Sequence, residues 1–185
     1  GGSQILKTAT NGRIAVRMGD YNEAEADGSF TMYSGMLSFI QGGNNITAAG
    51  NVDIYVGQNA VIVDMIQCGG TKKPVASANV TVDGAVVDEI YINGHSAAAT
   101  MGTVNLTIRN AAVSKINYHR TTDAAATTTT ANLVLDHAAV GSLCGKDSRI
   151  IAGSLTLKNY SDLTLNSSLS GWDTVKLENA VVYIS

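Results

Sequence analysis

The sequence predicts an all-β fold in which short parallel strands wind into a parallel β-helix, also called a β-solenoid. Two observations carry this prediction. One frame recurs along the chain, reading apolar, x, apolar, x, x, Ala, x, Val, x, x, apolar, and its copies start 20 to 27 residues apart. Within each copy the apolar residues alternate in twos over short runs rich in Val, Ile, Leu and Thr, which is the period of a strand and not of a helix.

The copies of this frame predict about seven coils. They begin at Phe30, Ile54, Val80, Leu106, Leu133, Leu155 and Val175, and the second copy has one extra residue in its turn. No single coil can bury its own inner face, so the stack of coils is the expected core.

The same frame sets the expected domain boundaries. Residues 1–28 fit it poorly and are expected to form an N-terminal cap or a degenerate coil, whereas 29–185 are expected to form one β-helix domain. A cap is needed because an open solenoid end exposes a strand edge. The sequence stops midway through its last copy, which predicts end-to-end association or a neighbouring domain at that coil.

Composition argues against two functional classes, nucleic-acid binding and membrane spanning. Charged residues make up 15% of the chain and the net charge is −3, so there is no basic surface for nucleic acid. No apolar run approaches the length of a membrane span, so the chain is not expected to be transmembrane.

A left-handed corner is expected after the first strand of each coil. The frame places Gly, Asn or His there, at Gly84, Asn110, His137, Asn159 and Asn179. These residue types tolerate a positive φ better than most others. The small Ala that follows in most copies fits a crowded turn.

A charged residue precedes each of these corners, and the sign alternates along the stack. The column contains Asp83, Arg109, Asp136, Lys158 and Glu178. Stacked coils lie roughly 4.8 Å apart, so these side chains are expected to form a structural ladder that helps to set coil register. A catalytic role for the same charges is the alternative.

A polar column lies one residue before the first strand of the frame. Its members are Ser29, Asp53, Asn79, Asn105, Asn132, Ser154 and Thr174. One interpretation is a hydrogen-bonded ladder along the axis. The other adds the outward residues Tyr55, Thr81 and Thr107, and predicts a flat ribbon that binds a glycan or a crystalline surface through Asn79, Thr81, Asn105, Thr107, Asn132 and Tyr55.

Other candidate sites are less specific. An acidic run of Asp20, Glu23, Glu25 and Asp27 is either a solvated loop or a Ca²⁺ site, and no other cofactor is expected. His95, His119 and His137 lack a carboxylate or Ser at motif spacing. Cys68 and Cys144 follow strands three coils apart, about 14 Å at this spacing, so both are expected to be free thiols.

The segments between the copies are expected to be surface loops, where binding residues are commonly built on a rigid scaffold. They lie at 41–51, 68–78, 93–103, 117–131 and 144–153. Tyr91, Tyr118 and Trp172 are the nearest aromatic candidates for stacking on a sugar.

Over residues 28–185 the repeat resembles right-handed parallel β-helices of the pectin-lyase-like architecture. Its Asn column, its Gly or Asn corner and its Ala-x-Val turn look like those of bacterial surface adhesins and autotransporter passengers. The resemblance implies a secreted or cell-surface bacterial protein that is not an enzyme. It would serve as an adhesin, a ligand-binding segment or a rigid stalk, with host or microbial glycans or matrix proteins as partners.

Two alternative functions stay open. The first is a polysaccharide-active enzyme, a lyase or a hydrolase of the β-helix class. Polysaccharide lyases of this architecture use clustered acidic Ca²⁺ ligands with an Arg or Lys base on one sheet face, whereas here Asp53 stands alone and Arg109 belongs to the alternating charged column. The second alternative is binding to ice or to a mineral surface by the Asn and Thr ribbon, which Val134 and Lys176 interrupt.

Overall fold

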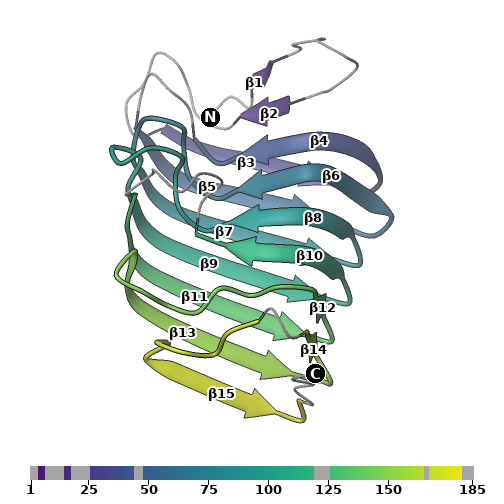
Figure 1. Ribbon diagram of the computed structural model, residues 1–185. Coiled ribbons are helices and arrows are strands. Elements are labelled where there is room, and N and C mark those ends of the chain that lie inside the picture. Colours follow the sequence, from purple (N-terminus) through teal and green to yellow (C-terminus); the bar gives the residue numbers. More distant parts are fainter. Residues whose placement is uncertain are drawn as a thin grey trace.

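A computed structural model describes residues 4–6, 15–17, 26–43, 48–118, 126–164 and 167–180. Within these residues the chain is all-β, and its strands stack as a parallel β-solenoid (Figure 1). The predicted fold class is therefore confirmed. No helix in the described part of the chain is long and apolar enough to cross a membrane.

The strands form two sheets that face each other across the core. Sheet A contains β1 (Gln4–Leu6), β2 (Ala15–Arg17), β4 (Gly35–Gln41), β6 (Ala60–Gln67), β8 (Val86–Tyr91), β10 (Ala112–Asn117), β12 (Ala139–Val140) and β14 (Asp162–Leu163). Sheet B contains β3 (Ala26–Met32), β5 (Ala49–Val56), β7 (Val75–Asp83), β9 (Met101–Arg109), β11 (Thr128–Asp136), β13 (Ile150–Lys158) and β15 (Thr174–Glu178). From β2 onward the chain alternates between the sheets, so each sheet grows by one strand per turn.

Strand pairing follows the repeat frame. Val80 of β7 is the partner of Leu106 of β9, and Leu106 is the partner of Leu133 of β11. The strands of sheet B begin earlier than expected, however, because β7, β9, β11 and β13 are nine residues long. The segments that were expected to be loops are therefore shorter, because their last residues belong to the sheet B strands that follow them. These last residues do so because residues such as Val75 and Met101 also point into the core.

The core is a stack of matching apolar columns. Sheet B contributes Ile54, Val80, Leu106, Leu133 and Leu155, and sheet A contributes Ile62, Val87, Val113, Val140 and Leu163, all at most 2% exposed. Each such side chain gains about 1.5–3 kcal/mol when it leaves water. Because the columns cross every turn, removing one side chain leaves a gap against the coils on both sides.

The predicted left-handed corners are confirmed. The φ angles of Gly84, Asn110, His137, Asn159 and Asn179 are 74°, 50°, 51°, 54° and 50°. The first four of these corners connect β7, β9, β11 and β13 to the sheet A strand that follows each of them, and Asn179 follows β15. The backbone N–H of one corner donates to the carbonyl of the charged residue in the next coil, as from Gly84 to Arg109 (3.0 Å) and from Asn110 to Asp136 (3.0 Å).

The stack has about five turns, fewer than the seven expected. The seven copies do form seven strands of sheet B, and β15, the strand of the last copy, is the last strand that the structure describes. In β15 the inward positions Val175 and Leu177 remain 39% and 55% exposed, because no described coil lies beyond them. At the N-terminal end β2 pairs with β4 in parallel, and β1 pairs with β2 antiparallel. The remainder of the predicted cap, residues 1–28, lies largely outside the described residues.

Candidate functional site

The polar column predicted from the sequence runs along the outer face of sheet B. Asn79 Nδ2 donates to Asp53 Oδ1 (2.7 Å), Asn105 Nδ2 to Asn79 Oδ1 (2.8 Å), Asn132 Nδ2 to Asn105 Oδ1 (2.9 Å), and the Ser154 hydroxyl to Asn132 Oδ1 (2.8 Å). We call these five residues the asparagine ladder. An ionised carboxylate only accepts hydrogen bonds, so Asp53 at one end orients every donor in the same direction.

The other residues of the predicted ribbon lie beside this ladder. Thr81 and Thr107 align with Tyr55 in adjacent strands of sheet B and are partly exposed. The Tyr55 hydroxyl donates to Asp83 Oδ2 (3.1 Å), so it is tied to the charged column. The outer face of sheet B thus presents the expected ribbon, and its role in ligand binding stays a prediction.

A second hydroxyl column on this face was missed by the sequence analysis. Ser77, Thr103 and Thr130 are aligned in β7, β9 and β11, on the opposite side of the asparagine ladder from Thr81 and Thr107. They lie in segments that were expected to be loops. The signal was present in the sequence, since each of these residues lies two positions before an Asn of the ladder.

The charged column forms ion pairs between some neighbouring coils. Arg109 Nη2 lies 2.8 Å from Asp83 Oδ2, and Lys158 Nζ lies 3.5 Å from Asp136 Oδ2. The hydrogen bond from Arg109 lowers the pKa of Asp83, with help from Tyr55 and Asn110, and Asp83 in turn raises the pKa of Arg109. These interactions hold both groups ionised and bind coil to coil.

Glu178, at the end of the charged column, pairs within its own strand. Its carboxylate contacts Lys176 Nζ, and this contact lowers the pKa of Glu178, with a smaller effect from Lys158. The alternation of charge along the column therefore continues as far as Glu178. The strongest ion pair of Glu178, however, is with Lys176 of its own strand and not with the neighbouring coil.

The acidic run proposed for Ca²⁺ can be placed only in part. Asp20, Glu23 and Glu25 lie outside the described residues. Asp27 is exposed at the start of β3, and its Oδ1 accepts a hydrogen bond from the Asn51 backbone N–H (2.7 Å). Among the described residues, no group of three or more His, Cys, Asp or Glu is arranged to hold a metal ion.

The histidines and cysteines are dispersed through the fold. His119 lies outside the described residues, His95 lies in the segment between β8 and β9, and His137 lies in a corner with its Nδ1 3.1 Å from the Asn159 carbonyl oxygen. Cys68 and Cys144 are both free, as predicted. Burial raises the pKa of each thiol to about 12.

The aromatic residues proposed for sugar stacking are not presented to solvent as open platforms. Tyr91 is 2% and Trp172 7% exposed, and the partly buried Tyr118 ring lies 4.9 Å from the Arg149 guanidinium carbon. Tyr160, which the sequence analysis did not select, is 65% exposed. The sequence signal was its place in the copy that begins at Leu155, where other copies have Ala.

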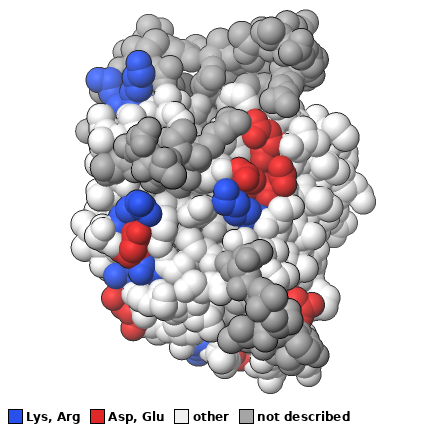
Figure 2. Space-filling view, viewed as in Figure 1, with Lys and Arg blue, Asp and Glu red and all other residues white. Residues whose placement is uncertain are grey.

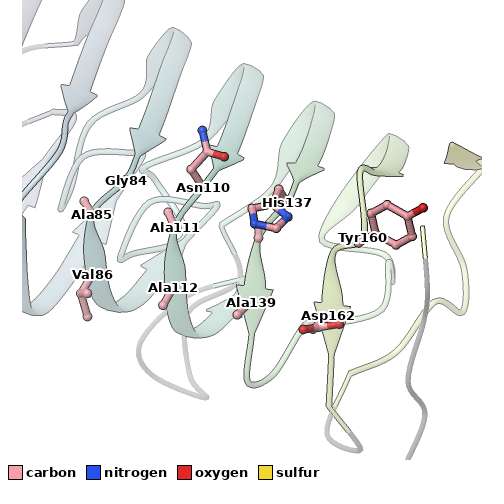
Figure 3. Close-up of a pocket in the computed structure, with 11 residues that line it drawn as sticks. Gly84, Ala85, Val86, Asn110, Ala111, Ala112, His137, Ala139, Tyr160 and Asp162 are labelled. Carbon is pink, nitrogen blue, oxygen red and sulfur yellow. The ribbon is translucent and has the colours of Figure 1, made fainter. Parts of the chain in front are cut away.

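A groove follows the left-handed corners across four coils, with a volume of about 510 Å³. In Figure 3 the side chains of Asn110, His137 and Tyr160 form a row along one side of it, and Ala112, Ala139 and Asp162 lie along the strands of sheet A below. A smaller hollow of about 290 Å³ adjoins it over sheet A, and the two share Val86, Ala112, Ala139 and Asp162.

A group of acidic residues lies on the outer face of sheet A, on strands β6 and β8 (Figure 2). Asp88 and Glu89 are on β8, and Asp64 lies beside them where β6 bulges. Lys115 of β10 pairs with Glu89 at 3.3 Å. This patch is thus also bridged from coil to coil by an ion pair.

Comparison of the chain with protein-family models, with curated proteins and with solved structures gives no match.

Proposed function

We propose that this chain is a rigid segment of a secreted or cell-surface bacterial protein, which presents a binding surface to glycans or matrix proteins as an adhesin or stalk does. The observation that carries the proposal is the use of exposed polar side chains to join coils. The asparagine ladder joins five successive strands of sheet B, and ion pairs cross between coils on both sheets. A rod of this kind keeps its surface features at constant spacing.

Rigidity favours a presenting role for a physical reason. A ligand that binds a preformed surface does not have to order flexible loops, so less of its interaction energy is lost. Exposed side chains that already hold one another in place are suited to this role. The pectin-lyase-like and adhesin-like classes suggested by the repeat are part of the same proposal.

The geometry of the charged column favours this role over catalysis. A residue that acts as a general base on the sheet face must be unprotonated near neutral pH. Contact with Asp83 instead raises the pKa of Arg109, which favours its protonated form. Glycoside hydrolysis requires two carboxyl groups on either side of a sugar bond. In the described column, Asp83 and Asp136 are instead each bound to a cation of the next coil.

The test is binding of the labelled chain to an array of neutral and acidic polysaccharides, host glycans and matrix proteins, with Ca²⁺ and with a chelator. We expect saturable binding to at least one class of surface. Loss of that binding in chelator would assign it to the acidic run that includes Asp27. Turnover of any polysaccharide on the array would instead support the enzyme alternative.

The two hydroxyl columns also favour a second candidate, binding to ice or to a mineral face. Ser77, Thr103 and Thr130 on one side of the asparagine ladder, and Thr81 and Thr107 on the other, lie on one sheet with in-register strands. Thermal hysteresis of the wild-type chain, abolished by Thr103→Lys, is the expected result for this candidate. A freezing point equal to that of a matched solution of an unrelated protein would exclude ice binding.

A further inference from the structure

The corner between β13 and β14 contains one residue more than the three corners before it, which connect β7 to β8, β9 to β10 and β11 to β12. Asp136 is the strand partner of Lys158, and Ala139 is the partner of Asp162. Along the chain, two residues lie between Asp136 and Ala139, whereas three lie between Lys158 and Asp162. The insertion is local, since the strands on both sides of it keep their register.

The residue displaced by this insertion is Tyr160. Ser161 takes the buried place of Ala138: it is 0% exposed, its hydroxyl accepts from the Ala138 N–H (3.1 Å) and donates to the Lys158 carbonyl (3.0 Å). Tyr160 is left 65% exposed with φ of 62°, a conformation that a bulky side chain rarely adopts. Its N–H donates to the Asn179 carbonyl (2.8 Å), so the backbone that carries the ring is held in place.

The exposed ring lies at one end of the corner groove (Figure 3). Methyl groups of Ala112 and Ala139 line the sheet A side, and the polar groups are the Asn110 amide, the His137 imidazole, the Tyr160 hydroxyl and the Asp162 carboxylate. At the other end Gln58 lies next to Gly84, where an added Cβ would be 3.0 Å from Gln58 Cγ. The groove therefore has an apolar lining, a polar rim and an aromatic platform.

The backbone along this groove argues against a peptide as its occupant. The N–H groups of Gly84, Asn110 and His137 all donate to carbonyls of the next coil, at 3.0 Å each. The N–H groups of Ala112 and Ala139 donate to carbonyls of the preceding coil, at 3.1 and 3.0 Å. An extended peptide binds a sheet by pairing with free backbone groups at an edge, and this groove is not such an edge.

The charge of the groove argues against an anionic occupant. Its lining includes one carboxylate, Asp162, and neither Lys nor Arg. Amide, imidazole, phenol and carboxylate groups hydrogen-bond to hydroxyls, and an aromatic ring with small apolar neighbours covers the apolar face of a ring-shaped ligand. An uncharged sugar ring combines these two features.

We propose that the corner groove is a binding site for an uncharged oligosaccharide that lies along the solenoid axis, with one sugar ring stacked on Tyr160. This inference rests on the proposed presenting function and names its ligand class and its surface. It assigns ligand binding to the corner and leaves the asparagine ladder a structural role.

The experiment compares binding of uncharged hexasaccharides of glucose, xylose and mannose to the wild type and to variants by calorimetry. Tyr160→Gly removes the ring at a position where glycine relaxes the backbone, so we expect unchanged or higher thermal stability together with a loss of affinity of about tenfold or more. Tyr160→Phe keeps the ring and is expected to retain most of the affinity. Ala112→Gln places a longer side chain in the groove and should also weaken binding.

One further variant is a matched control, and another tests the competing surface, the ribbon on sheet B. Tyr33→Ala removes another highly exposed tyrosine, 70% exposed, in the turn between β3 and β4 and outside the groove lining. Thr107→Ala changes the ribbon on sheet B. Both are expected to bind like the wild type.

The outcomes separate this inference from the proposed function. Binding that survives Tyr160→Gly and is lost in Thr107→Ala would overturn the groove and leave the presenting function in place, on the ribbon. Saturable binding of the wild type to charged glycans or matrix proteins alone would also overturn the groove and not the function. Absence of binding to every sugar, glycan and protein tested would overturn both.

Discussion

The asparagine ladder makes a prediction about stability that strand propensity alone does not make. Asn105 is at the centre of the ladder, where it donates to Asn79 (2.8 Å) and accepts from Asn132 (2.9 Å). Asn105→Ala removes both hydrogen bonds. Each is worth about 0.5–1.5 kcal/mol, and Asn105 is exposed, so the lower part of that range applies. We expect a loss of about 1–2 kcal/mol in the free energy of unfolding.

The matched control is Thr107→Ala, two residues along the same strand and on the same face. Thr has the higher strand propensity of the two, so propensity by itself predicts that Thr107→Ala costs more than Asn105→Ala. The ladder predicts the reverse order. For a chain of this size, 1 kcal/mol corresponds to a change of about 2–4 °C in the melting temperature.

The assay is thermal and urea unfolding followed by circular dichroism. A double-mutant cycle of Asn105→Ala with Asn79→Ala isolates the energy of the bond between the two side chains. A smaller loss of stability in Asn105→Ala than in Thr107→Ala, together with additive effects in the cycle, would refute a stabilising role for the ladder.

Three further predictions follow from the corners, the thiols and the charged column. At Asn110, where φ is 50°, replacement by Val should cost about 1–2 kcal/mol more than replacement by Gly in urea unfolding, and equal costs would contradict the left-handed corner. Cys68 and Cys144, with pKa values raised to about 12, should react with a thiol reagent at pH 8 much more slowly in the native chain than in denaturant, and equal rates would contradict their burial. The pKa of Asp83 is lowered chiefly by Arg109, so its contribution to stability is present above its unfolded pKa of about 4 and is lost as pH falls through the folded value. The stability gap between wild type and Asp83→Asn should therefore be present at pH 7 and close in acid, and a gap independent of pH would count against the pair.

The repeat frame predicted more of the structure than any single motif did. The alternation of Val80 and Val82, repeated at Leu106 and Ile108, specified strands that share one inner face, and the observed register matches it. The Gly or Asn after each first strand specified a left-handed corner because few other residues adopt a positive φ at low cost. Both are properties of local sequence that recur, so they can be recognised without knowledge of the fold.

The candidate site was harder to predict, because it depends on which side chains the stack leaves exposed. Tyr91 and Trp172 were the obvious aromatic residues, but the winding of the chain buries them. Tyr160 becomes exposed only because one inserted residue displaces it from the corner while Ser161 fills the buried position. In the repeat frame this copy is irregular, but the frame does not show which of its residues turns outward.

By itself the sequence determined the fold class, the inward and outward columns and the corner conformation, since all three follow from a period and from the backbone preferences of Gly and Asn. Tertiary structure alone decided the number of turns, the partners within the columns and the groove at the corners. The physical reason is that a column acquires hydrogen bonds or a cavity only when neighbouring coils, more than 20 residues apart in the chain, come to lie one strand spacing apart.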